Sequence, residues 1–175
     1  MKVLAVGDIH GDTDLAKELA ERATKENVDF VVMCGDISHS DKNFEGIVGL
    51  FKQKVLLVPG NHDSDATVDF LAEMYKARNL EGYGYNLGEV GFFGCGSVVQ
   101  GVFQKHERDI LELLKRGASY VKDCKKRVLV SHTHPTGTKM ERFSDFVHGS
   151  ESLRTAIDEL KPDFVFCSHV HEAEG

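Results

Sequence analysis

The stretch VLAVGDIH, residues 3–10, sets a pattern that the rest of the chain repeats. A short apolar run ends in a glycine, and an aspartate and a histidine follow almost at once. Four apolar residues without polar alternation are typical of a strand that is buried on both faces. The stretch therefore predicts a buried strand over residues 3–6 with polar side chains at its carboxyl end.

Four further apolar runs end in side chains that can bind a cation. In open α/β sheets, ligands bind beyond the carboxyl ends of the strands, so we expect the five ends to meet at one site. An Asp-x-His or His-x-His pair on an extended segment points both side chains to the same side, which suits chelation. The runs and the residues after them are 28–33 with Asp36, 55–58 with Asn61 and His62, 128–130 with His132 and His134, and 164–167 with His169 and His171.

Helical patterns separate these strands. Leu15, Leu19 and Ala23 recur at a spacing of four, and further helices are expected over residues 65–77, 110–115 and 153–160. The turn-rich stretch 81–101 is expected to form antiparallel strands around residues 90–93. The β-α-β alternation with an added hairpin predicts an α/β domain with a partly mixed sheet.

Composition limits the classes to which the chain can belong. With 175 residues, 41% of them hydrophobic, we expect one compact domain over residues 1–175. The net charge of -7 offers no general basic surface to a polyanion, so a phosphate site would need local positive charge such as bound metal ions. The four cysteines form no C-x-x-C pair and are expected to be free thiols.

Neither a signal peptide nor a membrane span is expected. The apolar stretch at the N-terminus is too short for a signal peptide, and about 18 consecutive apolar residues, as a span requires, occur nowhere. Together with the free thiols, this favours a cytoplasmic protein with no membrane partner.

Seven residues are candidate metal ligands, and they combine carboxylate, imidazole and amide donors. Such a mixture suits Mn, Fe, Zn or Ni better than calcium, and we expect manganese first. Seven ligands exceed one tetrahedral zinc site but suffice for two divalent ions that share a carboxylate, about 3.5 to 4 Å apart. The candidates are Asp8, His10, Asp36, Asn61, His132, His169 and His171.

The same motifs carry a resemblance to a known family. Their order along the chain resembles the signature blocks of the calcineurin-like metallophosphoesterases, and the match covers nearly the whole sequence. The resemblance implies an α/β fold in the form of a four-layer α/β/β/α sandwich of two mixed sheets. The matching blocks are Asp8-x-His10, Gly35-Asp36, Gly60-Asn61-His62-Asp63, His132 and His169-x-His171.

The resemblance also implies roles for these residues. Asp36 would bridge two metals, and His62 would stay unligated beside the scissile phosphate as proton donor or charge stabiliser, with Asp63 orienting it. A metal-bridging hydroxide would attack phosphorus in line, without a covalent intermediate. One metal would be held by Asp8, His10 and His171, and the other by Asn61, His132 and His169.

The chain departs from the family pattern in two places. Ser168 stands where the family usually has a glycine before the first histidine of the last block. Family members usually continue with further strands after this block, whereas this sequence ends at Gly175. We therefore expect either a truncated chain or a shortened second sheet.

The leading functional hypothesis is a dinuclear metal-dependent hydrolase that acts on a small phosphoester, with a preference for phosphodiesters. A phosphomonoesterase or a nucleotide pyrophosphohydrolase would keep the same metals. A non-catalytic binding scaffold is the alternative from another class, although its site would be expected to be damaged. A nuclease would need a basic channel, so a nucleic acid partner is not expected. A homo-oligomer stays open, because an exposed sheet edge could promote dimerisation.

Several further residues have more than one interpretation. His134 could bind a metal, but lining the pocket or stabilising its turn is the preferred interpretation. Arg142 and Arg154 could clamp a phosphate, although a helix-surface position explains Arg154 equally well. Surface positions are expected for His39, His106 and His148, of which His39 is near enough to Asp36 to approach a substrate.

Overall fold

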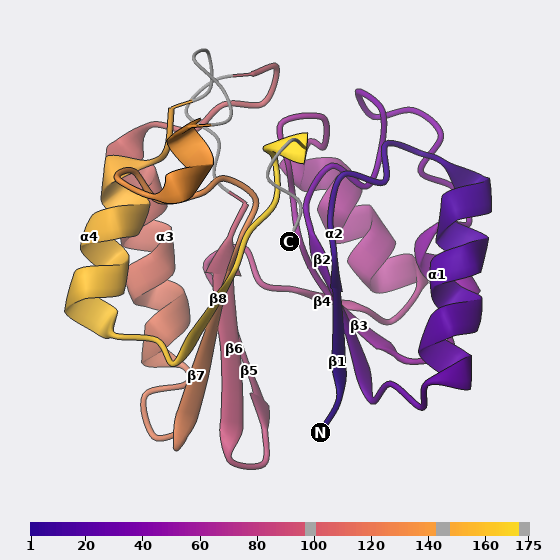
Figure 1. Cartoon of the computed structure of the whole chain (residues 1–175), viewed down its shortest axis with the longest axis horizontal. Helices are drawn as coiled ribbons and strands as arrows, with labels where there is room; N and C mark the ends of the chain where they lie inside the picture. Colours follow the sequence, from indigo (N-terminus) through magenta and orange to yellow (C-terminus); the bar gives the residue numbers. More distant parts are fainter. Residues whose placement is uncertain (97–100, 143–147, 172–175) are drawn as a thin grey trace.

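The computed structural model describes residues 1–96, 101–142 and 148–171. Two four-stranded sheets lie face to face, and Figure 1 shows them between two outer layers of helices. In the first sheet all described pairings are parallel, and its strands in order are β1 (Val3–Val6), β2 (Phe30–Cys34), β3 (Lys54–Val58) and β4 (Arg78–Asn79). In the second, β5 is antiparallel to β6 and the others are parallel, in the order β5 (Gly84–Leu87), β6 (Val90–Cys95), β7 (Lys126–Ser131) and β8 (Phe164–Phe166).

Two helices cover the outer face of each sheet (Figure 1). The expected α/β/β/α sandwich is confirmed, but only the second sheet is mixed. In the first sheet every described connection returns to the starting edge through a crossover, which makes neighbouring strands parallel. The helices are α1 (Thr13–Lys25) and α2 (Asp65–Met74) over the first sheet and α3 (Glu107–Ser119) and α4 (Glu151–Leu160) over the second, with short 3₁₀ turns η1 (Val48–Leu50) and η2 (Lys139–Arg142).

The apolar runs are continuous because both faces of the central strands are buried. In β2, Val31 packs with the residues of α1 and α2, while Val32 packs between the two sheets. In β3, Leu57 likewise packs on the helix side, and Leu56 packs between the two sheets. Successive strand residues point to opposite faces, so a strand with helices on one side and a sheet on the other needs apolar side chains at every position.

The two sheets meet in a shared apolar layer. Phe92 and Val130 of the second sheet lie in one cluster with Leu56 and Val58 of the first. All four side chains are fully buried. Burial of such a side chain contributes about 1.5–3 kcal/mol each, so this layer fixes the position of one sheet on the other.

Polar side chains mark where the helices begin. Asp12 caps α1 by accepting hydrogen bonds from the N–H groups of Asp14 and Leu15. Ser64 caps α2 through the N–H of Thr67, and Ser150 caps α4 in the same way. Because Ser64 follows the GNHD block directly, the cap also fixes where the loop after β3 ends.

The sequence predicted the elements well and their ends less well. The expected hairpin is confirmed as β5 and β6, although residues 97–100 of its stretch lie outside the described part. The expected helix over 110–115 extends over Glu107–Ser119.

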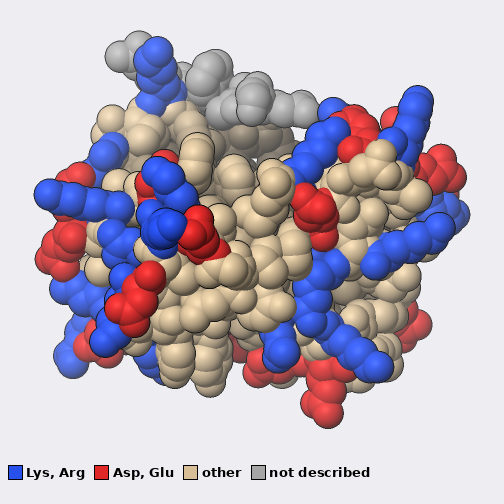
Figure 2. All heavy atoms as spheres, turned by 90° about the horizontal axis from the view of Figure 1, so that it is seen from below, with Lys and Arg blue, Asp and Glu red and all other residues tan. Residues whose placement is uncertain are grey.

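On the face shown in Figure 2, basic and acidic side chains lie side by side around an uncharged area. No helix within the described ranges is long and apolar enough to cross a bilayer.

Candidate metal centre

The loops that follow the parallel strands are held together by main-chain hydrogen bonds. The N–H of Asp8 donates to the carbonyl of Gly35 at 3.1 Å, and that of His10 donates to Asp36 at 2.8 Å. In the second sheet the N–H of Ser168 donates to the carbonyl of His132 at 2.9 Å. The loops within each sheet therefore keep a fixed register beyond the ends of their strands.

One group of candidate ligands comes from the first and last described loops. Asp8, His10 and His171 each offer a ligand atom, and these atoms lie within 4.8 Å of one another. His171 Nε2 is 3.4 Å from Asp8 Oδ1, and His10 Nε2 is 4.0 Å from the same oxygen. The expected set for one metal is thus brought together.

A second group lies beside it. Ligand atoms of Asp36, His132 and His169 also lie within 4.8 Å of one another. His132 Nε2 is 3.1 Å from His169 Nδ1 and 3.0 Å from the amide oxygen of Asn61. Asn61, His132 and His169 therefore share one small volume, as expected for the second metal.

Asp36 lies between the two groups. Its Oδ2 atom is 3.6 Å from His10 Nε2 in the first group and 3.4 Å from His132 Nε2 in the second. Its Oδ1 atom accepts the main-chain N–H of His62 at 2.8 Å. The hydrogen bond orients the carboxylate so that one oxygen faces both groups, which is the geometry of a shared ligand.

Four of the seven candidate ligands lie in the left-handed region of backbone space. The φ angles are 55° for Asp8, 49° for His10, 51° for Asp36 and 75° for His169. Non-glycine residues adopt this region uncommonly, and such strained backbone clusters at functional sites. The strain here places side chains toward a common point.

Two glycines beneath the site are required by close approach. A Cβ at Gly35, whose φ is +89°, would lie 2.7 Å from the ring of His132. At Gly60, a Cβ would lie 2.0 Å from the carboxylate of Asp36. Neither position accepts a side chain without displacing a candidate ligand.

His132 is oriented by groups behind it. Its Nδ1 atom lies 2.8 Å from the carbonyl oxygen of Cys34 and 3.0 Å from the hydroxyl of Ser168, which itself donates to that carbonyl at 2.7 Å. A carbonyl only accepts hydrogen bonds, so Nδ1 carries a proton. In the neutral ring Nε2 then keeps the lone pair that would face a cation in the site. Ser168, the departure from the family pattern, thus contacts the back of a ligand, which sequence spacing did not reveal.

Charge at the site follows from burial and from the carboxylates. Burial opposes ionisation of Asp36 and His132, but their mutual hydrogen bond and charge outweigh it, so the pKa of Asp36 is lowered and that of His132 is raised. Burial and the neighbouring His132 lower the pKa of His169 to about 4. Burial also lowers the pKa of His10, against the opposing charge of Asp36. His10 and His169 are therefore neutral near pH 7, as metal binding requires.

Unpartnered polar atoms show that the site fits a cation. Asp8 Oδ1 and His10 Nδ1 are buried without a hydrogen-bond partner among the described residues. Buried polar atoms are normally paired, and a bound ion is one recognised explanation for an exception. Carboxylate, amide and imidazole donors grouped in this way match the preferences of divalent transition metals.

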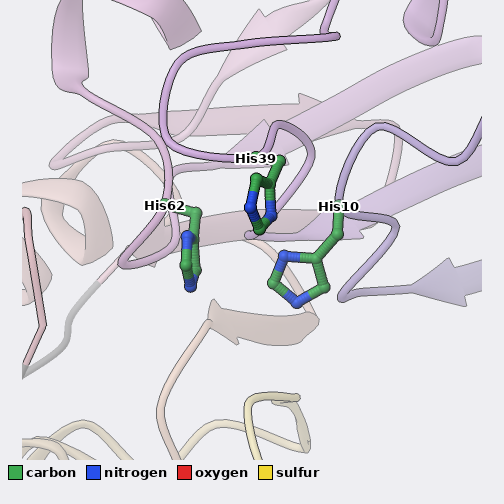
Figure 3. A group of neighbouring side chains, drawn as sticks. All are labelled: His10, His39 and His62. Atoms are coloured by element: carbon green, nitrogen blue, oxygen red, sulfur yellow. The ribbon is translucent and has the colours of Figure 1, made fainter.

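His62 lies beside His10 of the first ligand group, and His39 is the third imidazole of this cluster (Figure 3). Its ring centroid is 4.9 Å from that of His10, and it stacks on His39 at 5.4 Å with 14° between the planes. His62 Nδ1 is 3.2 Å from the hydroxyl of Ser40. His39 is exposed, as expected, yet it belongs to this cluster; its place three residues after Asp36 is the signal in the sequence.

Asp63 makes different contacts from those expected. Its carboxylate accepts the main-chain N–H groups of Ile37, Ser38 and Gly60 at 2.7–3.0 Å. These bonds tie the loop after β2 to the loop after β3. Ser40, rather than Asp63, lies beside the ring of His62, and the sequence pattern did not point to it.

The remaining candidates are placed as follows. His134 is fully buried, and neither ring nitrogen has a hydrogen-bond partner in the described part of the chain. Burial lowers its pKa, partly opposed by the charge of Glu141. Arg154 donates from Nε to the carbonyl of Thr136 at 3.0 Å and so supports a loop. His106 and His148 are exposed, and the side chain of Arg142 lies outside the described part of the structure.

The chain matches a known protein family over nearly its whole length. The family model of the calcineurin-like phosphoesterases matches residues 1–173. The chain therefore belongs to the calcineurin-like phosphoesterase family, which makes it a hydrolase of phosphoesters in a metal-dependent family.

Individual proteins resemble the chain in sequence or share its fold. The uncharacterised protein MJ1162 of Methanocaldococcus jannaschii is 31% identical over 99% of this chain and 81% of its own. The crystal structure of TT1561 from Thermus thermophilus shares the fold at 14% identity, with a TM-score of 0.74 over 94% of this chain and 80% of that one. A structure described as a novel archaeal phosphodiesterase matches at 17% identity and a TM-score of 0.50, over 85% and 81%.

Proposed function

We propose that the chain binds two divalent cations and hydrolyses phosphodiesters. The observation that carries the proposal is the position of Asp36, whose Oδ2 atom faces His10 at 3.6 Å and His132 at 3.4 Å. Either group alone would make an incomplete shell, but a shared carboxylate completes both. Asp8, His10 and His171 would hold one cation, and Asn61, His132 and His169 the other, with manganese as the first choice and Fe, Zn or Ni as alternatives.

The cations, when bound, would supply the Lewis acidity that polarises the phosphoryl oxygens and lowers the pKa of water. The chain's own residues fix the geometry. Asp36 is oriented by the N–H of His62, and His132 is oriented by the carbonyl of Cys34. Such supporting contacts hold ligands in position and typically affect metal affinity by about 10- to 100-fold.

His62 would protonate the leaving group. During hydrolysis the oxygen of water forms a bond to phosphorus, the bond from phosphorus to the ester oxygen breaks, and that oxygen takes a proton. The ring of His62 adjoins the first ligand group and is held by Ser40. General acid catalysis of this kind contributes about 10²- to 10⁴-fold.

The surroundings of His62 support a diester rather than a monoester. Its described neighbours are His10, His39 and Ser40, and no ammonium or guanidinium group contacts it among the described residues. A monoester carries two negative charges near neutral pH and a diester carries one, so the diester needs less compensation beyond the cations. A phosphomonoesterase or a nucleotide pyrophosphohydrolase would use the same ligands, and both are outcomes of the test below.

The test combines metal analysis with two chromogenic substrates. The purified protein loaded with Mn²⁺ is expected to hold two cations per chain and to cleave bis(p-nitrophenyl) phosphate faster than p-nitrophenyl phosphate. His62→Asn should keep its metal content and should lower kcat by about 10²-fold or more toward an alkyl diester such as glycerophosphoethanolamine, whose alkoxide leaving group needs a proton. The loss should be smaller for the nitrophenyl esters, because nitrophenolate leaves without one. Asp36→Asn should lose metal as well as activity. The exposed His148→Asn serves as the matched control and should change neither.

A protein that binds metal but cleaves neither ester would overturn the hydrolase and favour a binding scaffold. Faster cleavage of the monoester would overturn the diester preference alone. One cation per chain at saturation, with full activity, would refute the dinuclear centre.

A further inference from the structure

A cavity of about 440 Å³ is lined by Asp65, which follows the GNHD loop after Ser64, and by residues 102–106 and Asp109. Its wall is formed by the segment that leads into α3, and the N–H of Phe103 in that segment donates to the carbonyl of Asn61 at 3.3 Å. Gly101 also packs on Asn61, where an added Cβ would lie 2.6 Å from that side chain. The segment that lines the cavity thus contacts Asn61, a candidate metal ligand, although no candidate ligand lines the cavity itself.

The charges around the cavity disfavour a second phosphate. Asp65 and Asp109 line it together with one cation, Lys105. The Lys105 ammonium is already engaged, at 2.7 Å from Asp65 and 3.2 Å from the buried Glu81, and its side chain is only 15% exposed. A further anion would thus meet carboxylates without a free ammonium among the described lining residues.

Helix dipoles do not reverse this balance. The N-termini of α2 and α3 both border the cavity, and such ends attract anions. However, Asp65 occupies the first turn of α2, and Glu107 and Asp109 occupy that of α3. The partial positive charge of each helix end is therefore already compensated by its own side chains.

The lining suits a polar but uncharged group. Phe103 offers an apolar ring surface, and Gln104, His106 and Asp109 offer hydrogen-bond donors and acceptors. The side chain of His106 makes no capping bond to α3 and is exposed. A volume of 440 Å³ falls within the range of about 300–1,000 Å³ that is common for small-molecule sites.

We propose that this cavity binds an organic group of the phosphoester substrate, and that this group is an uncharged, hydrogen-bonding ring system of about nucleoside size without further phosphates. The inference rests on the proposed phosphoester hydrolysis, and it deepens it by naming the substrate class. It also disfavours the nucleotide pyrophosphohydrolase alternative, whose substrates carry a second phosphate.

The first test compares two diesters that share a leaving group. The Mn²⁺-loaded protein is assayed on the p-nitrophenyl ester of thymidine 5′-phosphate and on bis(p-nitrophenyl) phosphate. The double variant Gln104→Ala and Asp109→Ala should raise KM for the thymidine ester about tenfold, as the loss of hydrogen bonds predicts, with kcat little changed. Cleavage of the bis-aryl ester should change less than twofold. Asp123→Ala, an exposed carboxylate beyond the far end of α3, is the matched control.

The second test needs no catalysis. Calorimetry on the Mn²⁺-loaded protein is expected to show that thymidine 5′-phosphate binds at least about fivefold more tightly than thymidine 3′,5′-bisphosphate, and that Asp109→Lys narrows the difference. Equal or tighter binding of the bisphosphate, or an equal effect of the double variant on both diesters, would overturn the inference. If neither diester is cleaved, the hydrolase fails, whereas binding of thymidine 5′-phosphate that depends on Gln104 and Asp109 would still support the cavity.

Discussion

Gly7 lies near the start of the chain and Ser168 near the end of its described part, yet the two residues are in contact. Making Gly7 larger and Ser168 smaller tests whether their loops pack together as described. A Cβ at Gly7 would lie 2.5 Å from both the Cβ and the hydroxyl of Ser168. Gly7 is not in the left-handed region, so Gly7→Ala adds crowding without backbone strain. Overpacking of this kind costs about 1–3 kcal/mol. At about 2–4 °C per kcal/mol for a chain of this size, Tm should fall by about 2–12 °C.

The second site separates crowding from other causes. Ser168→Gly removes both atoms that the new methyl group would meet, so the double variant Gly7→Ala with Ser168→Gly should recover about 1 kcal/mol or more relative to additivity. Ser168→Ala removes the hydroxyl but keeps the Cβ at 2.5 Å, so it should recover less stability than Ser168→Gly, which makes it the matched control.

Thermal unfolding, followed by circular dichroism with chelator present, measures Tm for the original chain, the single variants and the double variants. The affinity for Mn²⁺ should fall in Gly7→Ala and recover more with Ser168→Gly than with Ser168→Ala. Gly7 precedes Asp8 and Ser168 precedes His169, so crowding between them would displace candidate ligands. Equal Tm values for Gly7→Ala with either partner substitution would show that the two loops do not touch as described.

Three further predictions concern the core, the caps and the buried imidazoles. Leu57→Ala, at a fully buried position of β3, should destabilise the fold by about 2–5 kcal/mol in chemical denaturation, whereas equal stability would contradict the packing of Leu57 between the first sheet and its helices. Ser64→Ala removes the cap of α2 and should cost about 1 kcal/mol in the same assay while leaving metal content unchanged. The pKa of His169 is about 4 in the folded protein and 6.5 in an unfolded chain, so the folded state binds fewer protons between these values. The metal-free protein should therefore lose stability as pH falls from 6.5 toward 4. His169→Gln should flatten that part of the Tm profile, and an unchanged slope would contradict the burial of the ring.

The sequence was most informative at the ends of the strands. Apolar runs buried on both faces, such as the one in β2, cannot be mistaken for loops, and a polar residue directly after such a run must lie at the edge of the sheet. This is why Asp36 and His132 could be assigned to one site before their distance was known. Helix ends were harder, because α3 begins with exposed polar residues that carry no apolar period.

Contacts between loops could not be predicted. Ser168 reaches the carbonyl of Cys34 across 134 residues, and Ser40 reaches His62 across 22, and no spacing rule links such pairs. The expected link between Asp63 and His62 had the same weakness, since adjacency in the sequence does not fix where a carboxylate points. The cavity lined by Asp65 depends on a segment that begins about 40 residues later and could only be found from coordinates.

The N–H of His169 donates to Asp8 at 3.0 Å, although 161 residues separate them. The two residues belong to different sheets, so cations held there would act as a cross-link that closes most of the polypeptide into a ring. A disulfide that closes a loop of about 100 residues stabilises the folded state by about 4.7 kcal/mol, because it lowers the conformational entropy of the unfolded chain. By analogy, cations bound between the two sheets would oppose their separation. The cations that serve the reaction would then also hold the two sheets together. A cell poor in metal would therefore lose both the activity and part of the stability of the fold.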